Sequence, residues 1–232
     1  EIGRGANYFD VEGFGANFAY TVDGGELGEL EYENFNAGAA KVVIHGLSIH
    51  TGSAKDAMVN ASLLAMEFHQ MLPVEQNPRY TTGYEGFFHL GHIEGEVELA
   101  EMDYIIRDHD AEKYAQKEQV MRDIAAYMNH KYGEGTVELT ITESYRNMKE
   151  KIEPHMHLIE NAKKAFRDCG VEPKIVAVRG GTDGARLSYM GLPCPNLSTG
   201  GHNFHGRFEY IPVESMDKMV ETIINIAKIY AD

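Results

Sequence analysis

Two carboxylates and one imidazole stand beside glycines at widely separated places in this chain. Glu1 opens the sequence in Glu-Ile-Gly-Arg-Gly, Asp23 stands in Val-Asp-Gly-Gly-Glu, and His205 stands in Asn-Phe-His-Gly. Carboxylate and imidazole are preferred zinc ligands, and glycine lets the turns that carry them bend out of the way. The pattern therefore predicts a metal site that draws its ligands from distant parts of the chain.

Each of these residues has a simpler interpretation when it is taken alone. Asp-Gly is a common hairpin turn, and Glu1 is a terminal residue that is easily disordered. His205 is one of 11 histidines, many of which must be ordinary surface or core residues. The metal hypothesis depends on the fold bringing all three residues to one edge of a sheet.

Composition narrows the class of protein. The 232 residues are 43% hydrophobic, which is enough for one large domain or two modest ones. The formal charge of −15 argues against a nucleic-acid partner and favours cations such as metals and protonated amines. Cys169 and Cys194 show no CxxC spacing and are expected to be reduced thiols of a cytoplasmic protein. We find no membrane-spanning run and no signal pattern.

Hydrophobic periodicity predicts two interleaved domains. Between residues 41 and 142 the expected order is strand, helix, two or three strands, helix, strand, which is a split βαβ, ferredoxin-like α+β domain. Outside it, strands alternate with helices, which favours a mostly parallel sheet with function at the strand C-termini. We therefore assign 37–145 as an inserted lid and dimerisation domain, and 1–36 with 146–232 as an α/β catalytic domain.

The predicted elements carry specific boundaries. Asp110 is expected to cap a helix that runs to Lys131, and Asn60 is expected on the surface of an earlier helix. The last helix should place Met216, Val220, Ile223, Ala227 and Tyr230 on one face. The expected helices cover about 56–72, 110–131, 154–168 and 213–230, and the expected strands 18–22, 41–44, 86–90, 96–99, 103–107, 136–142 and 175–178.

Five sequence blocks resemble one enzyme family. They are EIGRGA (1–6), YTVDGGELGE (20–29), GLSIHTGSA (46–54), RGGTDGA (179–185) and MGLPCPNLSTGGHNFHG (190–206). Together they resemble the di-zinc metallopeptidases that include glutamate carboxypeptidase and aminoacylase, and within them the enzymes that release the N-terminal residue from tripeptides. The resemblance runs from the first residue to the last helix and corresponds to the C-terminal half to three-fifths of such an enzyme.

The resemblance implies roles for individual residues. It implies that Glu1 and His205 bind one zinc ion and Asp23 the other, with two zinc ions per active site. The pair of ions would lower the pKa of a bridging water and polarise the scissile carbonyl. It also implies that the general base, the first His ligand and the bridging Asp precede Glu1 and are absent from the chain. His202 would lie near the site without being a ligand.

The lid is expected to contribute to substrate binding. The resemblance implies that His50 stabilises the oxyanion and that the lid forms a homodimer. Arg107 or Arg179 would bind the C-terminal carboxylate of a small peptide substrate. Simpler readings place His50 at a helix N-terminus and Arg107 in a surface ion pair, and Asp183 is expected to shape its loop. Gly180 and Gly181 match no phosphate-binding fingerprint.

Three functions therefore remain open from the sequence. The first is a zinc aminopeptidase acting on tripeptides. The second is a related amidohydrolase or carboxypeptidase of the same family. The third is a catalytically incomplete fragment that holds a dimerising lid and part of a catalytic domain.

Overall fold

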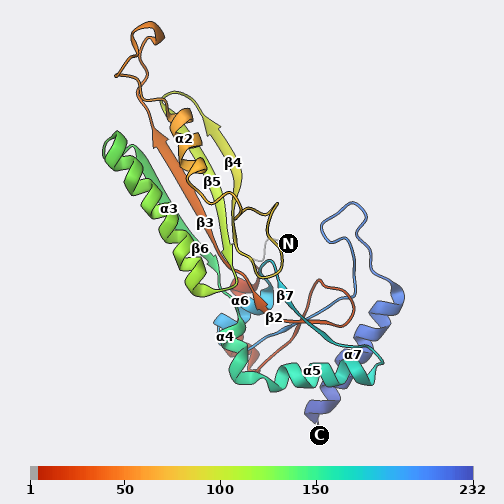
Figure 1. Cartoon of the computed structure of the whole chain (residues 1–232). Helices are drawn as coiled ribbons and strands as arrows, with labels where there is room; N and C mark the ends of the chain where they lie inside the picture. The colour runs from red at the N-terminus through yellow and green to blue at the C-terminus, as the bar shows by residue number, and fades with distance from the viewer. Residues whose placement is uncertain (1–4, 232) are drawn as a thin grey trace. The chain divides into compact units, whose positions relative to one another are not determined.

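The chain folds into two compact units. The computed structural model describes residues 5–231, and the chain divides into Glu1–Phe35 with Arg146–Asp232 and a second unit, Asn36–Tyr145 (Figure 1). The second unit is inserted in the sequence of the first. Each unit has its own hydrophobic core and is described by itself.

The Asn36–Tyr145 unit is a four-stranded antiparallel sheet with two long helices. The strand order is β4-β5-β3-β6, so the chain order strand, helix, strand, strand, helix, strand is the ferredoxin-like arrangement. This confirms the predicted inserted α+β fold. Its elements, with η for 3-10 helices, are β3 (Asn36–His45), η2 (Thr51–Ser53), α2 (Ala61–Gln70), β4 (Phe87–Gly95), β5 (Leu99–Asp108), α3 (Ala111–Tyr132) and β6 (Val137–Tyr145).

Alternation along the strands builds the core of this unit. On β5 every second residue is buried, and successive side chains of a strand point to opposite faces of the sheet. The buried face packs against α2 and α3, which lie along the sheet. The core joins Ala40, Val42 and Ile44 of β3, Ala100, Met102, Tyr104 and Ile106 of β5, and apolar residues of both helices including Phe68, Met121 and Met128.

Capping residues set where the two helices begin. Asp110 caps α3, because its Oδ1 accepts a hydrogen bond from the Lys113 amide at 2.9 Å, as predicted. The prediction for α2 was wrong by several residues: Asn60 is its N-cap, accepting from the Leu63 amide at 3.3 Å, and not a residue on its surface. The segment before it forms a loop in which Leu47 and Val59 pair in an isolated bridge.

The strands between the helices also differ from the prediction. Separate strands near 86–90 and 96–99 were expected, but β4 runs unbroken from Phe87 to Gly95. A tight turn then joins it to β5, closed by the Glu96 amide donating to the Leu99 carbonyl at 2.7 Å.

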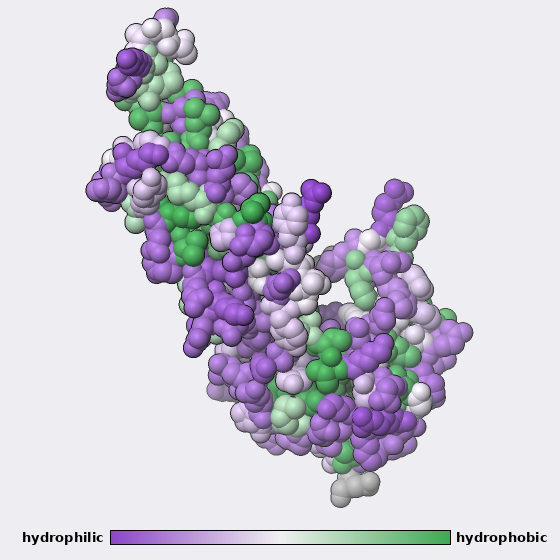
Figure 2. Space-filling view, in the orientation of Figure 1, coloured by the Kyte–Doolittle hydropathy of each residue, from purple (hydrophilic) through white to green (hydrophobic). Residues whose placement is uncertain are grey.

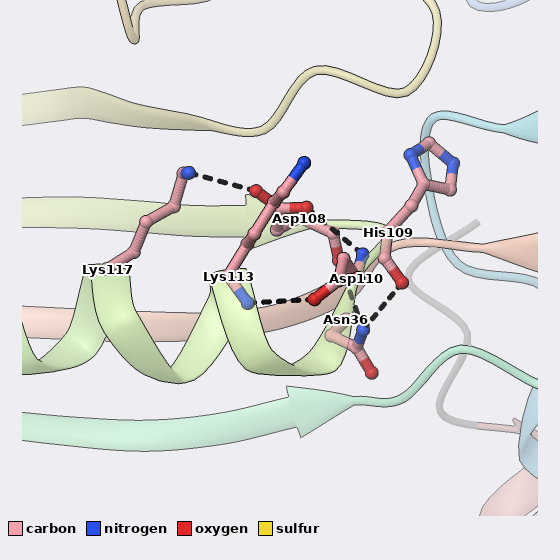
Figure 3. A network of polar contacts seen from close by, with 6 residues as sticks. All are labelled: Asn36, Asp108, His109, Asp110, Lys113 and Lys117. Atoms are coloured by element: carbon pink, nitrogen blue, oxygen red, sulfur yellow. Dashed lines mark hydrogen bonds and ion pairs between the residues drawn. The ribbon is translucent and has the colours of Figure 1, made fainter.

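A buried polar network fixes the end of β5 (Figure 3). Lys117 Nζ lies 2.9 Å from Asp108 Oδ2, and both side chains are almost fully buried. Asp108 Oδ1 also accepts from the Asp110 amide at 3.0 Å. Asn36 Nδ2 donates to the carbonyls of Asp108 and His109 at 3.1 and 3.0 Å. The network ties the first turns of α3 to the end of β5 and the start of β3.

The other unit contains a short mixed sheet. The strand order is β1-β8-β2-β7; β1 and β8 are parallel, β2 and β7 are parallel, and β2 and β8 are antiparallel. The sequence did not predict β2. The elements are η1 (Gly5–Tyr8), α1 (Val11–Phe14), β1 (Thr21–Val22), β2 (Glu29–Asn34), α4 (Lys149–Ile152), η3 (Glu153–His155), α5 (His157–Asp168), β7 (Lys174–Val178), α6 (Asp183–Tyr189), β8 (Asn196–Leu197) and α7 (Val213–Ala231).

The core of this unit lies between the sheet and its helices. Leu30 and Leu197 of the sheet join Ile159, Ala162 and Phe166 of α5, and α7 packs against α5 through Met219 and Ile226. Cys169 and Cys194 are both buried and unpaired, and burial raises the pKa of the Cys194 thiol to about 11. Within residues 5–231, no helix combines the length and apolar character needed to cross a membrane.

The Lys117–Asp108 pair should be far more important for stability than an exposed pair of similar length. We expect Lys117→Met to destabilise the Asn36–Tyr145 unit by about 3–5 kcal/mol, because it leaves a buried carboxylate without its counter-charge. The matched control, Lys41→Met, breaks the exposed Lys41–Glu101 pair (2.8 Å) and should have little effect. Hydrogen exchange of the α3 amides measures both; equal protection in the two variants would contradict the prediction.

Candidate metal site and substrate-binding residues

Asp23 directly follows β1, at the end of the sheet where the C-terminus of β8 also lies. Its amide donates to the Leu197 carbonyl at 2.9 Å, which extends the parallel pairing of β1 with β8. The simpler reading of Asp23 as part of a two-residue hairpin is wrong, because β8 lies between β1 and β2. Gly24 and Gly25 instead make a turn with φ of 61° and 74°, a left-handed conformation that favours glycine.

The segment after Asp23 lies beside the segment that leads to His205. The Thr199 amide donates to the Gly24 carbonyl at 2.6 Å and the Gly200 amide to the Gly25 carbonyl at 3.0 Å. His202 Nδ1 lies 4.0 Å from Glu26 Oε1. The two glycine-bearing loops that the sequence singled out are therefore neighbours in space.

His205 occupies a strained turn in the second loop. Its φ is 62°, which is uncommon for a residue other than glycine, and its amide donates to Glu209 Oε2 at 2.9 Å. Both Asp23 and His205 are exposed. A carboxylate and an imidazole are donors that zinc takes, so the two side chains have the chemistry that the metal hypothesis requires.

The described residues do not complete a metal site. Glu1, the third predicted ligand, lies outside the described residues. Within residues 5–231 there is no group of three or more His, Cys, Asp or Glu side chains that could hold a metal ion. The fold thus brings the Asp23 and His205 loops together, while the roles of all three residues stay predictions.

Behind Asp23, the fully buried Asn196 holds the end of β1 to β2. Its Nδ2 donates to the Asp23 carbonyl at 2.6 Å and to Glu31 Oε2 at 2.5 Å, and its Oδ1 accepts from Thr21 Oγ1 at 2.9 Å. Sequence reasoning missed Asn196 and Glu31. The signal available in the sequence was Asn196 itself, a polar residue between the apolar Pro195 and Leu197.

Glu31 is a buried acid close to Asp23. Burial raises the pKa of its carboxyl to about 7; the bond from Asn196 opposes this, and the negative charges of Glu29 and Asp23 add to it. A carboxyl with such a pKa is largely protonated below neutral pH. The charge next to the end of β1 therefore depends on pH near neutrality.

Arg179 lies at the opposite end of the strands from Asp23. It follows β7, which runs parallel to β2 and therefore opposite to β8. Function at the C-termini of a mostly parallel sheet was expected, but this sheet is mixed, so Arg179 and Asp23 follow strands that run in opposite directions. The Arg179 guanidinium lies 5.1 Å from the centre of the Phe35 ring, and Thr182, followed by Asp183, caps α6.

His50 and Arg107 belong to the Asn36–Tyr145 unit. His50 caps η2, accepting from the Gly52 amide through Nδ1 at 3.2 Å, so it begins a 3-10 turn and not the long helix α2. The Arg107 guanidinium lies 5.9 Å from the Phe87 ring centre and 6.0 Å from that of Tyr145. Phe87 pairs with Arg107, and Ala37 pairs with both Arg107 and Tyr145, so the cation and the two rings form one row across the sheet.

The inserted unit matches a known domain family, and the fold is shared with solved peptidases. Residues 32–136 match the family model of the peptidase dimerisation domain. The fold is shared with a Bacillus subtilis protein described as a dinuclear metal binding peptidase from the M20 family (TM-score 0.67, 13% identity), over 93% of this chain and 58% of that one.

Curated relatives resemble the chain along its whole length. Peptidase T from Alkaliphilus oremlandii is 58% identical over 231 residues, which is 100% of this chain and 56% of the relative. The fold is also that of a Staphylococcus aureus tripeptidase (TM-score 0.84, 21% identity), over 97% of this chain and 60% of that one. These matches confirm the resemblance read from the five sequence blocks. The chain spans little more than half the length of the relatives it matches.

Glu31 should make stability depend on pH when metal is chelated. The unfolded carboxyl releases its proton near 4.5 and the folded one near 7, so stability falls as pH rises between these values. We expect Glu31→Gln to remove this loss, and its stability relative to the parent chain should grow by up to about 3 kcal/mol from pH 4.5 to 7.5.

Urea unfolding in EDTA across this pH range measures the effect. The control is Glu221→Gln, which removes an exposed carboxylate paired with Lys218. A stability difference between Glu31→Gln and the parent that stays constant with pH would refute the assignment.

Proposed function

We propose that this chain forms part of a zinc-dependent aminopeptidase that releases the N-terminal residue from tripeptides. The observation that carries the proposal is the pairing of the Asp23 and His205 loops through Gly24, Gly25, Thr199 and Gly200. It is supported by the match to Peptidase T over the whole chain and by the match to the dimerisation domain. Neither the loop pairing nor the sequence matches depend on amino-acid composition alone.

Asp23, His205 and Glu1 would hold the metal in this proposal. When bound, zinc supplies a water of lowered pKa and a Lewis acid for the scissile carbonyl. The remaining ligands and the general base would come from outside this chain, because only part of the relatives' length is matched.

Acidic residues around Asp23 suit a peptide amine. Glu26 and Glu29 stand in the same turn, and the chain carries a formal charge of −15. A protonated N-terminal amine is attracted to such a surface, whereas an N-acyl group carries no positive charge. This favours an aminopeptidase over a deacylase.

Arg107 and His50 are the proposed lid contributions. The planar guanidinium of Arg107, held in a row with Phe87 and Tyr145, is suited to a bidentate bond with a carboxylate. Binding the far carboxylate would select substrates by length. His50 would donate a hydrogen bond to the oxyanion of the reaction intermediate. We also propose that the Asn36–Tyr145 unit forms a homodimer, in line with its match to the dimerisation domain.

A related amidohydrolase or carboxypeptidase activity is the second candidate. It is favoured only by the shared fold, since the solved structures with this fold include a putative aminohydrolase as well as a peptidase. Turnover of free tripeptides and of N-acyl amino acids by the same preparation separates the two. Faster hydrolysis of the N-acyl compounds would overturn the aminopeptidase proposal.

The metal role of His205 can be tested in an enzyme that joins this chain to the rest of a Peptidase T. We expect His205→Ala to lower metal-dependent tripeptide hydrolysis by roughly 1,000-fold or more, because a ligand is lost, while circular dichroism stays unchanged. His202→Ala is the matched control and should retain most of the activity. Full activity in His205→Ala would rule out its role as a ligand.

The carboxylate role of Arg107 predicts a dependence on substrate. In the same enzyme, Arg107→Ala should raise KM for a free tripeptide by about 30-fold, because a charge-assisted bond is lost, and should change KM little for the tripeptide amide. Arg179→Ala, measured in parallel, tests the alternative residue. If Arg107→Ala affects the acid and the amide equally, Arg107 does not bind the carboxylate.

A further inference from the structure

The connection from α2 to β4 in the Asn36–Tyr145 unit is unusually long. It covers residues 71–86, and the structure, which describes all of them, places none in a helix or strand. Connections longer than about 12–15 residues without such elements are uncommon in compact domains, and many of them carry a binding function. We call this segment the 71–86 loop.

The 71–86 loop is ordered by its own hydrogen bonds. Three backbone bonds close turns inside it: the Gln76 amide to the Pro73 carbonyl (3.1 Å), Tyr80 to Asn77 (2.9 Å) and Glu85 to Thr82 (3.0 Å). A further bond, from the Phe88 amide to the Gln76 carbonyl at 2.9 Å, attaches the loop to β4. Gly86 lets the loop approach β5 closely, because a side chain there would collide with the Arg107 carbonyl oxygen. A compact loop held in this way can form a fixed wall of a binding site.

The 71–86 loop and the first turns of α3 border a groove of about 500 Å³, which we call the α3 groove. The groove lies within the Asn36–Tyr145 unit, since all the residues that line it belong to that unit. Small-molecule sites in proteins commonly measure about 300–1,000 Å³ and combine apolar walls with a few polar groups. The α3 groove has both, because Pro73 and Val120 line it together with charged side chains.

Two ammonium groups line the helix side of the α3 groove. Lys117 Nζ is almost fully buried and lies 2.9 Å from Asp108 Oδ2, which is one acceptor for its three N–H groups. Lys113, one turn earlier, is exposed, and among the described residues no carboxylate lies within ion-pair distance of its Nζ. Figure 3 shows both side chains extending from the same side of α3. The helix side can therefore donate several hydrogen bonds to one anionic group.

A carboxylate on the loop side complements these ammonium groups. Glu75 lines the groove and is exposed, and in the described part of the chain it forms no ion pair, not even with Lys113. Glu85, by contrast, has a role within the loop, because its Oε2 accepts from the Thr82 amide at 2.9 Å. Opposite charges that line one groove without pairing fit a molecule that carries both charges.

Aromatic rings stand beside the charged groups. Tyr80 and Tyr84 line the groove and are 60% and 58% exposed, and the Tyr84 ring centre lies 4.9 Å from that of His109. Tyrosine rings offer a large apolar contact to a ligand side chain. On the visible face of this unit, hydrophobic residues are interspersed with hydrophilic ones (Figure 2), a mixture that suits a small polar ligand better than a broad apolar partner.

The lining also argues against other classes of ligand. A polyanion such as a nucleotide would face three carboxylates, those of Glu75, Glu85 and Asp108. A wholly apolar molecule would remove the charged groups from water without giving them partners. A small zwitterion with an apolar side chain avoids both costs.

We propose that the α3 groove binds a free α-amino acid with an aromatic or large apolar side chain. Its carboxylate accepts hydrogen bonds from Lys113 and Lys117, its ammonium group donates to Glu75, and its side chain lies against Tyr80. Binding would tie the 71–86 loop to α3. The groove uses none of the residues assigned to metal or substrate, so this proposal does not depend on the proposed peptidase function.

The test titrates L-phenylalanine into this chain in EDTA and follows the backbone amides by ¹⁵N-resolved NMR. We expect saturable shifts at Gly86 and Val120, which line the groove. L-Phenylalaninamide lacks the carboxylate and N-acetyl-L-phenylalanine lacks the ammonium group, so each should bind at least about 10-fold more weakly. Shifts confined to other parts of the chain would overturn the proposal, and so would tighter binding of the dipeptide L-phenylalanyl-L-alanine.

Matched variants locate the site. Lys113→Met and Glu75→Gln should each weaken L-phenylalanine binding by about 10-fold or more, since each removes one charged partner. Both residues are exposed, and the same spectra verify folding. Lys228→Met removes an exposed lysine of α7 and should leave the affinity unchanged. Arg107→Ala should also leave it unchanged; loss of binding in that variant would place the ligand at the proposed substrate site and overturn the assignment. Equal weakening by Lys113→Met and Lys228→Met would overturn it as well.

Discussion

The candidate site depends above all on the parallel pairing of β1 with β8. That pairing is only two residues long, Thr21 with Asn196 and Val22 with Leu197. Such a short contact gains little from backbone hydrogen bonds alone, so side chains must support it. Asn196 does so from a fully buried position by bonding Thr21, the Asp23 carbonyl and Glu31 at once. The loops that carry Asp23 and His205 are neighbours because this strand pair holds.

The contacts of Asn196 also hold a buried carboxyl group, that of Glu31, next to the candidate site. Glu31 is buried beside other acids, and its pKa rises to about 7 as a result. A protein that only needed stability would not keep a buried acid here. An acidic environment is compatible with a site that attracts cations, so the cost of burying Glu31 fits the proposed chemistry.

The two units are held together internally by different means. The Asn36–Tyr145 unit has long antiparallel strands, a continuous core under two helices and the Lys117–Asp108 pair that closes one end. In the described part of the chain, the other unit has two strands of only two residues, and Val213, Val220 and Ile224 of its last helix are exposed.

The inserted α+β fold was predictable because its signals are local. Alternation along 136–142 and the Asp110 cap each specify an element over a few residues, and the order of elements then restricts the topology. Elements without a local signal were missed or misplaced. Strand β2 is rich in glutamate, the strand β4 was cut short, and α2 begins at a cap that the periodicity did not distinguish from the preceding loop.

By itself, the sequence determined the residue types at the candidate site, the glycines that let their loops turn, and the family that these blocks resemble. Only the tertiary structure decided that β7 runs opposite to β8, which places Arg179 and Asp23 at opposite ends of the strands. It also decided which arc of α7 is buried. The physical reason is the same in both cases. Strand direction and the choice between two apolar helix faces are set by long-range contacts, and a two-residue strand or an all-apolar stripe carries no local pattern that distinguishes the alternatives.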